Sequence, residues 1–181
     1  MKNKSKLLMT AFVALAFATG CASSTGEKSD ELTKDVKETK AEFLKSDDTL
    51  GATLDNASGY VIFPSVAKGA LGVGAATGKG ELFDKGNPHA SGDVSLNQVT
   101  IGLQAGGQSY AELILFEDAS TLDSFKKGNF EFSAQATAVA ATAGASANAK
   151  YEKGVMVLTI ANGGLMYEAS IGGQKFAYTP Y

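Results

Sequence analysis

Apolar residues recur with a helical period near the start of the chain. The residues that share one face of this pattern are Leu32, Val36, Thr39 and Phe43. Ser29 precedes them as an N-cap, and acidic residues follow it in the first turn, where the helix dipole favours negative charge. This pattern predicts a helix that begins at Ser29. A second short helix is predicted after residue 47 or 48, because Leu50 and Leu54 lie one turn apart.

From residue 59 onward, apolar and polar residues alternate with a period of two, which is typical of half-buried strands. Glycine and asparagine separate most of these segments, as antiparallel hairpins require. The predicted strands cover residues 60–63, 80–83, 94–104, 110–116, 129–141, 145–152, 154–160, 165–171 and 174–178. One helix interrupts them at residues 119–127, with Asp118 or Ser120 as its cap and Gly128 at its end.

The segment 130–151 admits two interpretations. Its alanine content favours a helix by intrinsic propensity, yet its residues alternate with period two on both sides of Gly144. We interpret it as a hairpin with one face lined by methyl groups, which lets another layer approach closely. The fold class that follows is α+β, with N-terminal helices packed on a Gly/Ala-rich antiparallel β-barrel or β-sandwich that has one inserted helix.

Glycine is concentrated between residues 69 and 80, which invites comparison with phosphate-binding loops. The spacing excludes a P-loop, because three residues instead of four separate Gly74 from Gly78, and no Ser or Thr follows Lys79. A dinucleotide fingerprint is excluded as well, since Thr77 stands where its third glycine belongs. We therefore interpret the cluster as a place where backbones pack closely.

The first 20 residues carry a targeting pattern. Lys2, Lys4 and Lys6 precede an apolar run at residues 7–18, and no acid accompanies them. A helix needs about 20 apolar residues to cross the hydrocarbon core of a membrane, so this run is too short for a permanent anchor. Residues 1–20 are therefore predicted to be a removable secretion signal.

The run ends in Ala18-Thr19-Gly20-Cys21, which resembles the bacterial lipobox. The resemblance implies that Cys21, the only cysteine of the chain, becomes the lipid-bearing N-terminus. Ala22 in place of Asp implies sorting to the periplasmic face of the outer membrane. We expect residues 21–28 to form a flexible tether and residues 29–181 to form one domain. The alternative is an ordinary signal peptide in which the cysteine is incidental.

The charge of the chain argues against nucleic acid as a partner. All 16 basic residues are Lys, and three of them leave with the signal, so 13 remain against 19 acids and the formal charge is −6. Nucleic-acid binding needs a basic face with many phosphate contacts, which this composition does not offer.

Residues suited to catalysis are scarce. The single His89 lies in a segment with loop composition, and no Gly-x-Ser-x-Gly motif occurs. Glu117 and Asp118 precede the predicted helix and are interpreted as its cap. The sequence therefore predicts no enzyme activity, no cofactor and no metal site. An enzyme would require His89 or distant carboxylates to converge in one concave site.

Several segments share their order and spacing with a known domain. They are Gly59-Tyr60-Val61-Ile62-Phe63-Pro64-Ser65-Val66-Ala67-Lys68-Gly69, Ile101-Gly102-Leu103-Gln104-Ala105-Gly106-Gly107, Glu112-Leu113-Ile114-Leu115-Phe116, the helix with Leu122 and Phe125, Gly163-Gly164-Leu165 and Glu168-Ala169-Ser170. In these segments the chain resembles the SYLF domain, also called the Ysc84 domain, over residues 48–181.

The resemblance implies a non-catalytic domain that binds phospholipid, with phosphoinositides and in some cases actin as ligands of eukaryotic members. The candidate residues for binding a lipid headgroup are Lys68, which matches a family lysine, and Lys79, Lys126 and Lys127. Ordinary solvated lysines are the alternative. We expect a membrane partner, engaged through the acyl anchor and through the domain. The rival function is a structural or protein-interaction module of the cell envelope whose partner the sequence does not name.

Overall fold

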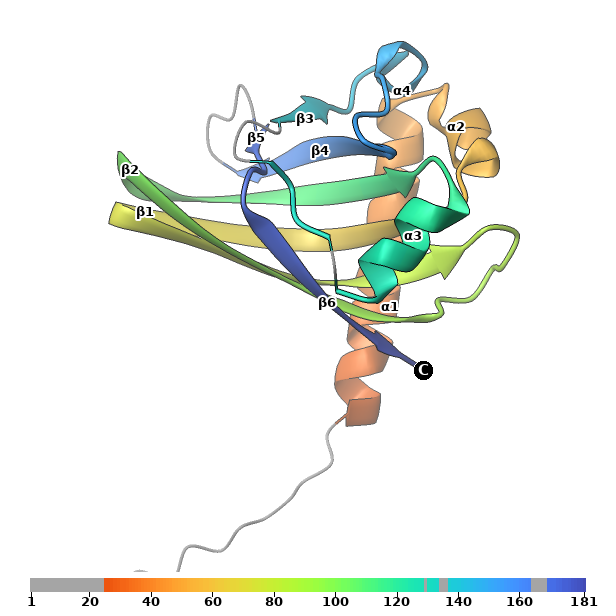
Figure 1. Ribbon diagram of the computed structural model, residues 1–181, viewed down its shortest axis with the longest axis horizontal. Helices are drawn as coiled ribbons and strands as arrows, with labels where there is room; N and C mark the ends of the chain where they lie inside the picture. The colour runs from red at the N-terminus through yellow and green to blue at the C-terminus, as the bar shows by residue number, and fades with distance from the viewer. Residues whose placement is uncertain (1–24, 129, 134–136, 164–168) are drawn as a thin grey trace, which may run out of the picture.

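The computed structural model describes residues 25–128, 130–133, 137–163 and 169–181 (Figure 1). In chain order the elements are α1 (Thr25–Ser46), α2 (Leu50–Asn56), β1 (Gly59–Asp84), β2 (Gly92–Phe116), α3 (Ala119–Lys126), β3 (Thr137–Ala140), α4 (Ala145–Asn148), β4 (Val155–Gly163), β5 (Ala169–Ser170) and β6 (Gln174–Pro180). The strand order is β1-β2-β4-β3-β5, and β6 also pairs with β2. The predicted α+β fold is confirmed. Within the described ranges the sheet path stays open, so the arrangement resembles a sandwich more than a closed barrel.

β1 and β2 form one long antiparallel ribbon that bends back on itself. The strands pair along nearly their whole length, and the register shifts at residues 71–73. This shift divides the ribbon into a first arm (residues 59–71 and 105–116) and a second arm (residues 73–84 and 92–101), which diverge from one tip in Figure 1. β4 extends the first arm and β6 extends the second, each by pairing with β2.

Glycine lets the two halves of β1 touch where the arms meet. A Cβ atom at Gly80 would lie 2.2 Å from the carbonyl oxygen of Ile62, and one at Gly59 would lie 2.8 Å from the carbonyl oxygen of Phe83. No side chain fits at such distances, because backbone atoms cannot move aside as a flexible side chain can. The interpretation of the glycine cluster as a site of close packing is confirmed at Gly80.

Two buried clusters fill the spaces around the sheet. The inner cluster lies between the two arms and α3, and includes Val61, Phe63, Leu82, Leu96, Tyr110, Ile114, Phe116, Leu122, Phe125, Val157 and Phe176. The outer cluster lies between the first arm and the helices α1 and α2, and includes Val36, Phe43, Leu50, Ile62, Leu113, Leu115 and Leu158. The sheet is therefore covered on both faces, which explains why its central strands are apolar on both sides.

The helical predictions agree with the structure except at one end. Val36, Thr39 and Phe43 are buried on one face of α1, and Asp118 caps α3 by accepting a hydrogen bond from the backbone of Thr121 at 2.8 Å. α1 begins at Thr25 instead of Ser29, so residues 25–28 are helical and do not belong to the tether. The predicted signal at residues 1–20, Cys21 and the rest of the tether lie outside the described residues.

Two pairs of predicted strands proved to be single strands. Residues 60–63 and 80–83 both belong to β1, and residues 94–104 and 110–116 both belong to β2. A bulge after Phe63 accommodates Pro64, which cannot donate a ladder hydrogen bond, so the strand continues through it. Glycine and proline mark bends here instead of strand ends.

The hairpin predicted for residues 129–152 was wrong. β3 is short and pairs in parallel with β4, so the sheet is mixed, and Ala145–Asn148 form the helix α4. The cause lies far away in sequence: the buried carboxylate of Asp47 accepts hydrogen bonds from the backbone of Ser146 at 2.6 Å and of Gly144 at 3.2 Å. This cap lets the helix propensity of alanine prevail. The predicted residues 129, 134–136 and 165–168 lie outside the described part of the chain.

Candidate functional site

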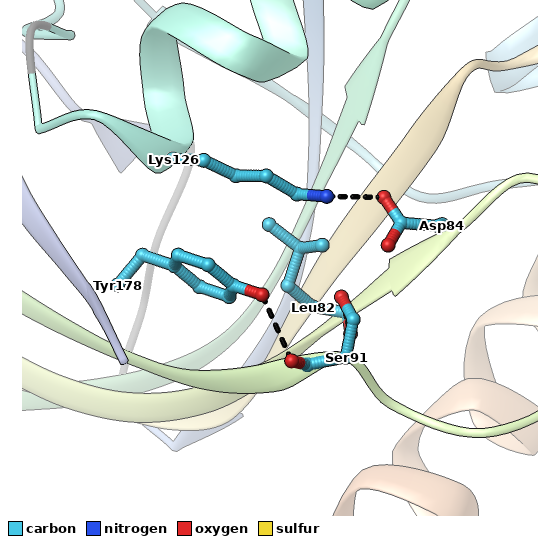
Figure 2. A network of polar contacts seen from close by, with 5 residues as sticks. All are labelled: Leu82, Asp84, Ser91, Lys126 and Tyr178. Atoms are coloured by element: carbon cyan, nitrogen blue, oxygen red, sulfur yellow. Dashed lines mark hydrogen bonds and ion pairs between the residues drawn. The ribbon is translucent and has the colours of Figure 1, made fainter. Parts of the chain in front are cut away.

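Lys126, one of the residues predicted to bind a lipid headgroup, takes part in a polar network (Figure 2). Its Nζ lies 2.5 Å from Asp84 Oδ1 and 5.8 Å from the centre of the Tyr178 ring. Tyr178 in turn donates its hydroxyl to the carbonyl oxygen of Ser91 at 2.8 Å, and the backbone of Ser91 donates to that of Leu82. The network ties α3 to the end of β1 and to β6, so Lys126 has a structural role.

The other three predicted lysines lie in different parts of the fold. Lys79 is exposed in the second arm and Lys127 is exposed just after α3. Lys68 lies in the first arm beside the buried Glu112. Burial lowers the pKa of Lys68, and the charge of Glu112 opposes that shift. The structure thus places these lysines on separate elements.

A buried carboxylate lies inside the fold, in the layer between the arms. Glu112 is fully buried, and it accepts a hydrogen bond at Oε2 from Gln174 Nε2 at 3.0 Å. The same nitrogen approaches the hydroxyl of Tyr110 at 3.3 Å. Burial raises the pKa of Glu112 to about 7, although the bond from Gln174 and the charge of Lys68 act in the opposite direction. This cluster is enclosed and polar, with a titratable group at its centre.

A concave feature lies on the same face of the sheet, where β3 and β4 meet residues 130–133, the segment that follows α3. It is a pocket of about 250 Å³. Its lining residues are Phe130, Glu131, Phe132, Ser133, Thr137, Val139, Lys150, Glu152, Lys153, Val155, Met156, Val157 and Ile171. We call it the β4 pocket.

The β4 pocket combines an apolar floor with a charged rim. Phe132, Val157 and Ile171 are buried in the floor. Around the rim, Glu131, Lys150, Glu152 and Lys153 are all exposed. An apolar cavity with a few polar groups at its mouth is the usual form of a small-molecule site.

The sequence analysis missed this pocket. None of the four predicted lysines is among its lining residues. Val139 in β3 and Val157 in β4 both line the pocket, and the predicted hairpin excluded the parallel pairing of these two strands. Phe130, Phe132 and Lys150 are visible in the sequence, but aromatic residues followed by a distant lysine do not indicate a cavity.

No candidate metal site is found in the part of the chain that the structure describes. There, no three His, Cys, Asp or Glu residues lie close enough to hold a metal ion. His89 is exposed in a loop, and its backbone nitrogen bonds to the side chain of Asn87. No helix in the described ranges is both long enough and apolar enough to cross a membrane.

Comparison with known proteins supports the predicted family. Residues 97–179 match the Ysc84 family, described as "Las17-binding protein actin regulator". Beta cell expansion factor A of Aeromonas veronii is 32% identical over 124 residues, which are 67% of this chain and 46% of that protein. The chain thus aligns with less than half of that relative.

Proposed function

We propose that this chain, which carries a Ysc84 (SYLF) domain, is a lipid-anchored protein of the cell envelope whose domain binds phospholipid. The observation that supports lipid binding is the β4 pocket, with its buried apolar floor and its ring of charges. An amphiphile presents the same two surfaces, an apolar chain and a polar head. Burial of the chain would provide most of the affinity, at roughly 0.8 kcal/mol for each methylene group.

Anchoring at the membrane rests on Cys21 and the lipobox around it. One acyl chain holds a protein only marginally at a bilayer, whereas several hold it stably. A triacylated N-terminus would keep the domain beside the periplasmic face of the outer membrane, where the domain meets phospholipid at high local concentration. Mass spectrometry of the protein from its native host tests this part: we expect residue 21 to carry acyl chains, and an intact leader would contradict it.

Sedimentation with vesicles tests lipid binding by the domain itself. The segment 23–181 lacks the leader and Cys21 but contains every helix and strand that the structure describes. We expect it to sediment with vesicles of phosphatidylethanolamine and phosphatidylglycerol. Failure to bind any bacterial phospholipid would leave the acyl anchor alone and would contradict the proposal for the domain.

A matched pair of variants locates the contact. Val139 lines the β4 pocket and is 43% exposed, whereas Val99 lies on β2 outside this pocket and is 73% exposed. A glutamate at either position is compatible with folding, because both side chains already reach solvent. We expect Val139→Glu to weaken vesicle binding and Val99→Glu to leave it unchanged, since only the first places a charge beside the buried chain.

The description of the matching family favours one second candidate, a protein-interaction module. That description names binding to the protein Las17 and regulation of actin. For this chain, the corresponding function would be contact with another protein of the envelope. Cross-linking in cells tests it: one stoichiometric protein partner, captured equally well by the Val139→Glu variant, would favour this candidate over lipid binding.

A further inference from the structure

We propose that the β4 pocket holds one acyl chain of a phospholipid whose headgroup is zwitterionic. This inference rests on the proposed function and names the class of lipid. It concerns a site that none of Lys68, Lys79, Lys126 and Lys127 lines, so the pocket would act independently of those lysines.

The size of the pocket limits its occupant to a single chain. Its volume is about 250 Å³, whereas sites that enclose a drug-sized molecule usually measure roughly 300 to 1,000 Å³. Both chains of a diacyl lipid would not fit, and the second chain would remain in the membrane or be absent from the ligand. The floor is apolar and largely shielded from water, since Phe132 and Val157 are each 6% exposed and Ile171 is 1% exposed. An acyl chain is compatible with such a floor.

The rim determines the headgroup. It carries two lysines, Lys150 and Lys153, and two carboxylates, Glu131 and Glu152, and Glu131 also pairs with Lys175, outside the lining, at 3.7 Å. An anionic headgroup would be attracted by the lysines but repelled by the carboxylates. A cationic headgroup would be attracted by the carboxylates but repelled by the lysines. A zwitterion such as phosphoethanolamine can place its phosphate near a lysine and its ammonium near a carboxylate, so that every charge has an opposite neighbour.

The net charge of the whole domain also favours a zwitterionic lipid over an anionic one. The chain after residue 20 has 13 Lys and 19 acids, a formal charge of −6. An acidic protein is repelled by an anionic membrane surface within a Debye length of about 8 Å at physiological salt. A neutral zwitterionic surface carries no such penalty, so the domain approaches it more readily.

Single-chain lipids in solution test the proposal without a membrane. The segment 23–181 is titrated by calorimetry with lyso-phosphatidylethanolamine and, separately, with lyso-phosphatidylglycerol, each below its micelle concentration. We expect the zwitterionic lipid to bind more tightly, by about two- to fivefold, which is the range that exposed charge contacts provide. Equal binding, or tighter binding of the anionic lipid, would overturn the choice of headgroup.

A charge reversal at the rim provides a second test of the headgroup preference. Glu152→Lys leaves three lysines against Glu131, so we expect the preference to shift toward lyso-phosphatidylglycerol. Glu42→Lys makes the same change in charge on the exposed surface of α1, outside the pocket, and should leave the preference unchanged. A shift of equal size in both variants would reduce the effect to net charge and overturn the role of the rim.

Vesicles separate this inference from the proposed function. If wild-type protein binds neither vesicles nor lysolipids, the proposed function itself fails. If it binds vesicles but neither lysolipid, and Val139→Glu binds vesicles as well as wild type does, the domain binds lipid elsewhere and only the present inference fails. Binding of the zwitterionic lysolipid without vesicle binding supports the pocket and assigns it a free single-chain lipid as its ligand.

Discussion

Gln174 Nε2 donates a hydrogen bond to Glu112 Oε2 at 3.0 Å and thereby joins β6, on the second arm of the ribbon, to the first arm. The other oxygen of each side chain, Oε1 in both cases, is buried without a partner among the described atoms. A proton on Glu112 provides the missing donor, because a neutral carboxylic acid and an amide can exchange two hydrogen bonds. One proton then satisfies two buried acceptors.

The stability of the domain should therefore fall as the pH rises toward neutrality. The pKa of Glu112 is raised from 4.5 to about 7, so the folded state retains a proton that the unfolded chain has lost. The contribution is complete below pH 4.5 and disappears as the pH passes through about 7, with a total of about 3 kcal/mol at 1.36 kcal/mol for each pKa unit. Urea unfolding at pH 5 and pH 8 measures it.

The control for this effect is Glu112→Gln, which keeps the shape and the bond to Gln174 but cannot ionise. We expect the free energy of unfolding of this variant to change much less between pH 5 and pH 8. An equally steep fall in the variant and the wild type would show that another group is responsible.

Asp47 should make the domain sensitive to strong acid. Burial alone would raise its pKa, but hydrogen bonds from Thr49 and Ser146 outweigh burial and lower the pKa from 3.8 to about 2. Its contribution is present above pH 3.8 and is lost as the pH falls through about 2, amounting to about 2 kcal/mol.

The matched comparison for Asp47 uses its exposed neighbour. Asp47→Asn should lower the free energy of unfolding at pH 7 by about 1 to 3 kcal/mol, because it weakens the cap of α4. Asp48→Asn, at an exposed position, should have little effect. Equal losses in circular dichroism melts of the two variants would argue against the cap.

Gly80→Ala should destabilise the contact between the two halves of β1. The added methyl would lie 2.2 Å from the carbonyl oxygen of Ile62, so the arms must separate locally. Overpacking of this kind typically costs about 1 to 3 kcal/mol, which lowers the melting temperature by several degrees. Gly69→Ala meets no atom within 4 Å and should melt as the wild type does. A harmless Gly80→Ala would contradict the folded-back ribbon.

Lys126 and Lys127 should differ in their effect on stability, although they are adjacent in sequence. Lys126→Met removes the ion pair with Asp84, whose side chain is 36% exposed, and should cost up to about 1 kcal/mol. Lys127 is exposed, and Lys127→Met should be neutral in a thermal melt. Unchanged vesicle binding in both variants would fit the placement of the lipid site at the β4 pocket.

Local patterns in the sequence predicted the elements that depend on their own residues. The apolar stripe of α1, the Asp118 cap of α3 and the apolar run of β4 each follow from neighbouring positions. The failures have long-range causes. α4 depends on Asp47, about 100 residues away, and the bend of β1 depends on contacts between distant parts of one strand. The β4 pocket also has a long-range cause, because the parallel pairing of β3 with β4 brings its walls together.

Chemical-shift mapping tests the central claim most directly. A ¹⁵N-labelled segment 23–181 is titrated with lyso-phosphatidylethanolamine, and the amide shifts are followed residue by residue. The proposed function predicts that the largest changes occur at the β4 pocket, around Phe132, Val157 and Ile171. Saturable changes confined to other surfaces, or no changes at concentrations where vesicles bind, would contradict it.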